Sequence, residues 1–251
     1  MQTEKAVVEY FDFIESQVRT KSFNPSVVDA AKVFLPAFNE YLSVRDLLSS
    51  AEKTELESYY SVDFTNQYND LNPDDISGAA DALSSLSSNA LAMQYDFIAG
   101  SSFALGEKDG LVNLANNTQY AEAHRKYHPS MRRFLQEFGY YDIFIADIDS
   151  VFKELDFATS ISAGPYAQSG IGEVFTKAAN ASSEDQVFFS SFTTYRSSYD
   201  AMAGFAASPI YADGKPIAVL IFQMPMDRIN SLRSATQCSK QFLAPYWGGY
   251  V

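Results

Sequence analysis

The chain has 251 residues, enough for one large domain or two ordinary ones with a substantial hydrophobic core. Its 31 Asp and Glu outnumber its 18 Lys and Arg, which gives a formal net charge of −13 and argues against nucleic acid as a partner. The lone Cys238 excludes an intrachain disulfide framework and a Cys-rich zinc site. No apolar run approaches the ~20 residues that cross a bilayer, so we expect a soluble domain or the soluble part of a larger protein.

Residues 1–138 are predicted to form a helical N-terminal region. Apolar residues in the segment 4–18 recur at the spacing of one helix face. Pro25 is suited to begin a second helix, and Pro36 within that helix predicts a kink. Gly139 is placed to end the last helix of the region. Further helices are expected over 51–69, 81–100 and 119–139.

Residues 139–232 are predicted to form a sheet of mainly antiparallel strands. The pair Asp213-Gly214 predicts a tight hairpin, because this dipeptide readily adopts positive φ angles. A short helix is expected over 170–181, and residues 233–251 form a C-terminal tail of atypical composition. The strands are expected over 142–149, 184–195, 204–212 and 215–225. The predicted fold class is α+β, with N-terminal helices, one of them long, packed against the sheet.

Three carboxylates crowd the first predicted strand. Asp142 precedes Asp147 and Asp149, and the last two share one face if the strand continues. A hydrolase or a metal site could use such a pair of acids. Because Asp is also common where a strand ends and a turn begins, we favour the interpretation without chemistry.

Two histidines, His124 and His128, are four residues apart and would share one face of a helix, as in some metal sites. No carboxylate or cysteine accompanies them as a third ligand, so packing against the sheet or the lining of a pocket is favoured. No metal and no other cofactor is predicted.

A loop between two predicted strands gathers Tyr195, Arg196, Tyr199 and Asp200. A cation, an acid and aromatic rings together can hold a small polar molecule through charge-assisted hydrogen bonds and ring contacts. The alternative is a surface loop in which Arg196 and Asp200 pair with each other. The residues alone favour neither.

Several segments in their order along the chain carry a resemblance to a known family. They are HRKYHPSMRRFLQEFGYYDIFIADID, VFKELDFATSISAGPY, VFFSSFTTYRSSYDAMAGFAASPIY and GKPIAVLIFQMPMDRIN. Together they resemble the extracytoplasmic sensor region of bacterial methyl-accepting chemotaxis proteins, of the Cache or PAS-like type. The resemblance extends from about residue 4 to about residue 232.

The resemblance implies a periplasmic, non-enzymatic sensor that takes part in signal transduction. Its sheet would hold a small molecule such as an amino acid, an organic acid or an amine. Membrane attachment would come only through flanking segments, and the N-terminal helices would form a homodimer. The positions implied for the ligand pocket are Tyr141, Phe144, Lys153, Asp156, Tyr166, Phe192, Tyr195, Arg196, Tyr199 and Asp200. The alternatives are a hydrolase using Asp147 and Asp149, or a helical interaction module that binds no ligand.

Overall fold

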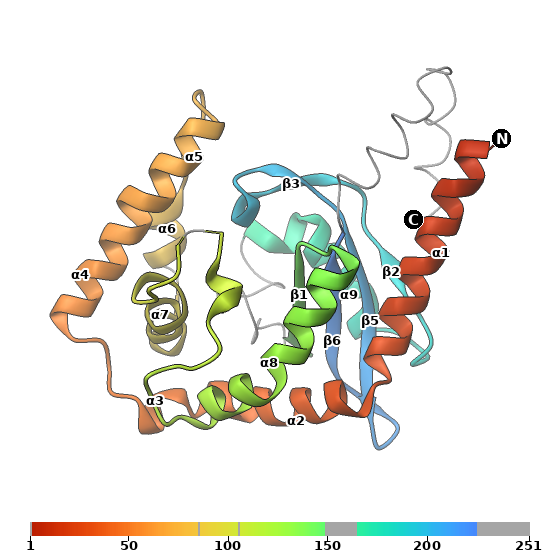
Figure 1. The fold of residues 1–251 in the computed structure, drawn as a ribbon, viewed down its shortest axis with the longest axis horizontal. Helices are drawn as coiled ribbons and strands as arrows, with labels where there is room; N and C mark the ends of the chain where they lie inside the picture. Colours follow the sequence, from red (N-terminus) through yellow and green to blue (C-terminus); the bar gives the residue numbers. More distant parts are fainter. Residues whose placement is uncertain (1, 85, 105, 149–164, 225–251) are drawn as a thin grey trace.

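A computed structural model of the chain describes residues 2–84, 86–104, 106–148 and 165–224. An antiparallel sheet lies on one side of the molecule, and a group of helices stands apart from it on the other (Figure 1). Helix α2 runs beneath both parts and connects them along one edge. The predicted α+β class is therefore confirmed.

Helices make up the N-terminal part, as the sequence predicts. In the described part of the chain, none of them has the length and apolar character needed to cross a bilayer. They are α1 (Gln2–Ser22), α2 (Pro25–Asn39), α3 (Tyr41–Val44), α4 (Ser50–Ser58), the π-helical η1 (Tyr59–Phe64), α5 (Thr65–Leu71), α6 (Ala79–Ser84), α7 (Ser88–Gln94), the π-helical η2 (Tyr95–Ala99), the 3-10 turn η3 (Lys108–Gly110) and α8 (Gln119–Phe138).

The C-terminal part contains the strands and one longer helix. Its four-stranded sheet has the order β1-β6-β5-β2 with every pair antiparallel, and β3 and β4 form a separate two-stranded ribbon. The elements are β1 (Asp142–Asp147), the 3-10 turn η4 (Pro165–Gln168), α9 (Gly170–Ala179), β2 (Phe188–Phe189), β3 (Thr193–Tyr195), the 3-10 turn η5 (Arg196–Ser198), β4 (Ala201–Ala203), β5 (Phe205–Ala212) and β6 (Lys215–Gln223).

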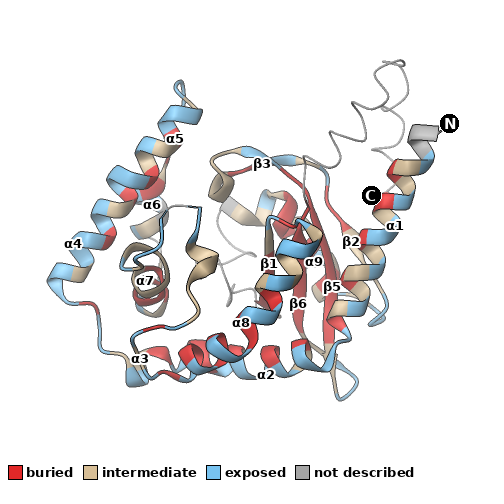
Figure 2. Cartoon of the chain, viewed as in Figure 1, coloured by how far each residue is buried: buried red, intermediate tan, exposed pale blue. Residues whose placement is uncertain are grey.

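Both faces of the four-stranded sheet are covered, because neighbouring residues of a strand point to opposite faces. On β1, Ile143 and Ile145 belong to the core beneath α1, α2 and α8. Phe144 and Ala146 point the other way, into the core beneath α9. The continuous buried surface along β5 and β6 in Figure 2 reflects this double cover.

Local signals in the sequence predict several boundaries correctly. Gly139 has φ 71° and ψ 29° and ends α8, as expected from its freedom to adopt the left-handed conformation. Asp213 (φ 52°) and Gly214 (φ 75°) form the predicted hairpin between β5 and β6. Helix α2 begins at Pro25, as predicted, and continues through Pro36 to Asn39, and the kink at Pro36 stays a prediction.

Two predicted elements are divided in the structure. The expected strand 184–195 becomes β2 and β3, since the Ser190 hydroxyl accepts a hydrogen bond from the Phe205 N–H (2.9 Å) and donates one to the Ser191 carbonyl (2.8 Å). The expected helix 81–100 becomes α6, α7 and η2, because the Ser87 side chain caps a new helix start.

A buried ion pair holds the separate group of helices together. The guanidinium of Arg45, after α3, contacts both carboxylate oxygens of Asp96, on η2, at 3.0 Å. The Asp96 carboxylate also accepts hydrogen bonds from the Tyr41 hydroxyl (2.5 Å) and the Asn116 amide (3.2 Å). Three segments of the chain, 41–45, 96 and 116, therefore meet at one carboxylate.

Candidate functional site

The predicted binding loop is the connection between β3 and β4, which we call the 195–200 segment. Tyr195 pairs with Ala201 in the ribbon, and η5 fills the turn between them. Tyr199 (φ 54°) and Asp200 (φ 56°) are both left-handed. That conformation costs a non-glycine residue about 1–2 kcal/mol, so two such residues in succession require support from their surroundings.

Part of that support comes from helix α5. The Asn72 amide, just beyond α5, donates a hydrogen bond to the Tyr199 carbonyl at 2.9 Å. The Tyr199 ring packs against Phe64 with ring centroids 5.1 Å apart. The Asp200 N–H closes the turn by donating to the Tyr195 carbonyl at 3.0 Å. The strained turn is thus held by the helical part of the molecule.

Arg196 and Asp200 form an ion pair, with Nε and Oδ2 3.3 Å apart. This pair is shared with the helices, because Arg196 Nη1 also donates to the carbonyls of Ile76 (3.2 Å) and Ser77 (2.7 Å) in the α5–α6 connection. The guanidinium lies over the Tyr68 ring, 5.2 Å from its centroid. The ion pair between Arg196 and Asp200, which the sequence left open, does form. Through the carbonyls of Ile76 and Ser77 it also joins the ribbon to the helices.

The Tyr68 hydroxyl completes this network. It hydrogen-bonds to Asp200 Oδ2 and lies 2.9 Å from Asp75 Oδ2. One hydroxyl has a single proton, so it donates to one of the two carboxylates at a time. Burial raises the pKa of Tyr68, and the hydrogen bonds to both acids raise it further. The backbone N–H of Ile76, followed by Tyr68, lowers the pKa of Asp75.

Gly78 is required where the α5–α6 connection approaches Arg196. Its φ is 61°, in the region that favours glycine, and a Cβ built at this position would lie 2.8 Å from Arg196 Nη1. A side chain here would therefore strain the backbone and displace the guanidinium.

Three of the other predicted residues lie together beneath α9. Tyr195 is buried, and its ring is 5.9 Å from that of Tyr166 and 5.1 Å from that of Phe205. The hydroxyls of Tyr166 and Ser197 are 3.0 Å apart. Phe144 belongs to the same buried cluster. The structure thus brings Phe144, Tyr166 and Tyr195 close to one another.

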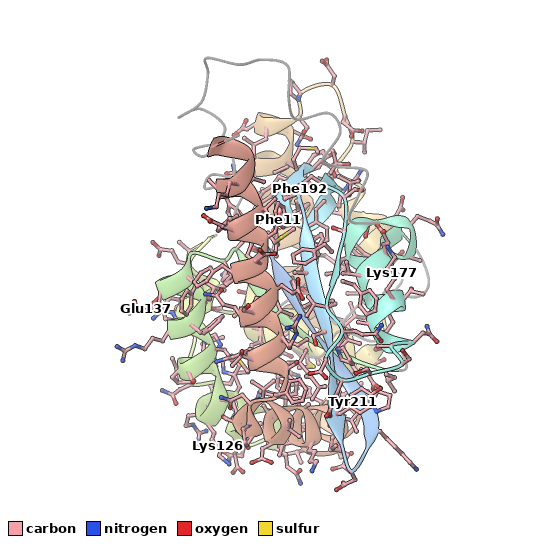
Figure 3. All side chains as sticks on the ribbon, turned by 90° about the vertical axis from the view of Figure 1, so that its right-hand side faces the viewer. Phe11, Lys126, Glu137, Lys177, Phe192 and Tyr211 are labelled. Atoms are coloured by element: carbon pink, nitrogen blue, oxygen red, sulfur yellow. The ribbon has the colours of Figure 1, made fainter. Side chains whose placement is uncertain are left out.

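The remaining predicted residues do not join this cluster. Phe192 packs on the opposite core, beside α1 (Figure 3), as does Tyr199. Tyr141 is 55% exposed at the start of β1. Lys153 and Asp156 lie outside the described residues. The predicted pocket set is therefore divided between the two faces of the sheet.

The clustered acids of the first strand are separated in the structure. Asp142 pairs with Gln223 and Asp147 with Ala218, at opposite ends of β1, and Asp149 lies outside the described residues. Burial raises the pKa of Asp142. Among the residues that the structure describes, no three His, Cys, Asp or Glu side chains are grouped so that they could hold a metal ion.

His124 and His128 are buried and stack on each other, with ring centroids 4.3 Å apart. His124 Nδ1 lies 3.3 Å from the Val112 carbonyl, and His128 Nε2 lies 2.7 Å from the Asp109 carbonyl. Burial, and then the neighbouring His128, lowers the pKa of His124 to about 3. The pair fixes the loop before α8 onto that helix, whereas the sequence favoured packing against the sheet or the lining of a pocket.

Tyr68, Asn72 and Asp75 are the residues of this network that sequence reasoning missed. Tyr68 lies 132 positions before Asp200 and Asn72 lies 127 before Tyr199, and a single sequence contains no signal that pairs residues so far apart. Asp75 joins the network through Tyr68. Comparison of the chain with family models, with curated proteins and with solved structures gives no match. The interpretation of the site therefore depends on the chain's own residues.

Proposed function

We propose that the chain is the ligand-sensing domain of a transmembrane signalling receptor of the chemotaxis class, and that it binds a small polar molecule at the 195–200 segment. The observation that carries this proposal is the shared ion pair between Arg196 and Asp200. Arg196 holds two carbonyls of the α5–α6 connection, and Asp200 accepts a hydrogen bond from Tyr68. A ligand that engages either charge competes directly with the contact between the ribbon and the helices.

The chemistry of the segment suits an amino acid, an organic acid or an amine. A ligand carboxylate can bind the Arg196 guanidinium, whose side chain is 41% exposed, in a two-pronged geometry. A ligand ammonium can bind the Asp200 carboxylate. Tyr166 is half-buried, and its hydroxyl lies 3.0 Å from that of Ser197 in the same segment, so its ring can offer an apolar surface for the rest of the ligand.

Binding at this segment could alter the sheet and the helices together. The Ser198 hydroxyl accepts a hydrogen bond from the Gln223 amide at the end of β6 (3.0 Å), and α1 packs on β5 and β6. A ligand that releases Arg196 from the α5–α6 connection would shift the balance between two arrangements of these elements. In the proposed receptor, α1 carries this shift to a flanking membrane segment.

A homodimer through the N-terminal helices is part of the same proposal. The sheet side of α1 is formed by Tyr10 and Ile14, and Phe13 between them is 47% exposed on the outer side. The helix pair is what the resemblance to chemoreceptor sensor regions implies, and within the chain the Phe13 ring packs on that of Phe138, with centroids 6.1 Å apart. The proposed location is periplasmic, as the resemblance to chemoreceptor sensor regions implies.

The two alternatives predict different results. A hydrolase that uses Asp147 and Asp149 would turn over an ester, a phosphate or a glycoside and would lose this activity in Asp147→Asn. A helical interaction module would bind no small molecule at all.

A thermal-shift screen with amino acids, organic acids and amines tests the proposal. A ligand at 100 times its dissociation constant stabilises the folded state by about 2.7 kcal/mol. We expect Asp200→Asn or Arg196→Gln to remove the shift, and the exposed substitution Asp213→Asn, in the β5–β6 hairpin, to leave it unchanged. If Asp200→Asn and Arg196→Gln respond like the wild type, the 195–200 segment is not the binding site.

A further inference from the structure

A concave site in the helical part is lined by none of the residues predicted to bind a ligand. An open cavity of about 420 Å³ lies between the η1–α5 stretch and the connection from η2 to η3. Its lining is mainly polar and charged. The lining residues are Tyr59, Asp63, Asn66, Gln67, Asp70, Ala99, Phe103 and Lys108.

One wall of the cavity is a polar stripe along a helix, which we call the 63–70 stripe. Asp63, Asn66, Gln67 and Asp70 follow one another at helical spacing and therefore line one face. Within the described ranges, the structure gives these four side chains no hydrogen bond and no ion pair, although burial lowers the pKa of Lys108 and the nearby charge of Asp63 opposes that shift. Asp63, Asn66 and Asp70 are exposed, so the stripe is open to water as well as to the cavity.

The opposite wall is fixed by packing and hydrogen bonds. The Lys108 ammonium donates to the carbonyls of Ser101 (3.3 Å) and Phe103 (2.5 Å) and lies 5.6 Å from the centroid of the Tyr59 ring. Phe103 closes over Gly110, where a Cβ would lie 2.6 Å from the ring. The wall across from the stripe is therefore built from specific contacts.

Both walls include a π-helical turn, which is infrequent and is often associated with functional sites. Tyr59 and Asp63 belong to η1, and Ala99 belongs to η2. The two turns are joined where the Tyr60 hydroxyl donates a hydrogen bond to the Gln94 side chain next to η2. The cavity is thus located where two irregular helical turns meet.

Charge decides the class of ligand. Two carboxylates face one ammonium, whose nitrogen is already held by main-chain carbonyls, so the cavity favours positive charge. The whole chain, with its net charge of −13, also attracts cations. The rings of Tyr59 and Phe103 can support an ammonium through cation–π contacts, as Tyr59 does for Lys108.

Spacing refines that class. Asp63 and Asp70 are seven residues apart, which corresponds to about 10 Å along a helix. The amides of Asn66 and Gln67 lie between them and can accept hydrogen bonds from a second or third amine. We propose that this cavity binds a linear diamine or polyamine, with its terminal ammonium groups at Asp63 and Asp70.

Isothermal titration calorimetry with cadaverine and spermidine tests this site, and butylamine provides the matched ligand with one ammonium. We expect both polyvalent amines to bind more tightly than butylamine. Asp63→Asn and Asp70→Asn should each weaken cadaverine binding about tenfold, because each removes one charge-assisted contact. Asp81→Asn, an exposed change of the same charge on α6, should alter the affinity by less than about twofold.

Three results would overturn the proposal. They are a lack of binding by either polyvalent amine, equal binding of butylamine and cadaverine, and a loss in Asp81→Asn as large as that in Asp63→Asn. Asp200→Asn separates this site from the 195–200 segment, because cadaverine binding is expected to persist in that variant. If cadaverine binding instead disappears in Asp200→Asn, the amine binds at the 195–200 segment, and the proposal of an amine site at the 63–70 stripe is wrong.

Discussion

The hydrogen bond from Tyr68 to Asp200 connects the helices to the 195–200 segment, and Tyr68→Phe removes it together with the contact of the same hydroxyl with Asp75. The Tyr68 ring is fully buried, so phenylalanine keeps the packing and loses only the hydroxyl. A hydrogen bond to a charged group contributes about 1.5–3 kcal/mol. We therefore expect the free energy of unfolding to fall by about 2 kcal/mol in Tyr68→Phe.

Equilibrium unfolding in urea measures this loss, and Tyr211→Phe is the matched control. The Tyr211 hydroxyl donates to the neutral Ala181 carbonyl at 3.1 Å, so its removal should cost only about 1 kcal/mol. A double-mutant cycle with Asp200→Asn should give a coupling of about 1–2 kcal/mol. The reasoning is refuted if Tyr68→Phe costs no more than Tyr211→Phe, or if Tyr68→Phe and Asp200→Asn are additive.

Three further predictions concern the surrounding structure. The pKa of His124 is lowered to about 3 in the folded state, so between pH 6.5 and pH 3 the unfolded state binds more protons than the folded state does. Lowering the pH to 5 should therefore reduce the free energy of unfolding by about 2 kcal/mol through this residue. In urea titrations, the free energy of unfolding of His124→Phe should fall by about 2 kcal/mol less than that of the wild type between about pH 7 and pH 5. An equal fall in variant and wild type would contradict this. Asp96→Asn should cost about 3 kcal/mol in the same assay, since it leaves the guanidinium of Arg45 underpaired; a loss below about 1 kcal/mol would show that the network is not cooperative. Gly78→Ala should destabilise more than Gly139→Ala, which has a similar φ but no atom within 4 Å of the added Cβ, and equal losses would contradict the contact with Arg196.

The sequence predicted the elements whose signals are local. Helix α9 was predicted from its apolar face of Ile171, Val174, Phe175 and Ala178, all of which are buried. The β5–β6 hairpin follows from Asp213 and Gly214, which can adopt positive φ angles without a partner elsewhere. The helix and the hairpin each depend on residues close together in the sequence, so the local sequence pattern is sufficient to predict them.

The candidate site was only partly predictable. Tyr195 and Tyr166 do lie together, as the resemblance implied. Phe192 lies three residues before Tyr195, an odd spacing that places the two on opposite faces of an extended chain, and the structure separates them accordingly. The contact of Asp200 with Tyr68 could not be predicted, because it depends on how the helices fold over the ribbon.

The structure of a ligand complex tests the central claim most directly. After the thermal-shift screen has identified a stabilising compound, its complex should show the compound in contact with Arg196 or Asp200. The hydrogen bonds from Arg196 to the Ile76 and Ser77 carbonyls should be lengthened or lost in that complex. A compound bound elsewhere, with the Arg196–Asp200 pair and both carbonyl contacts unchanged, would contradict the account.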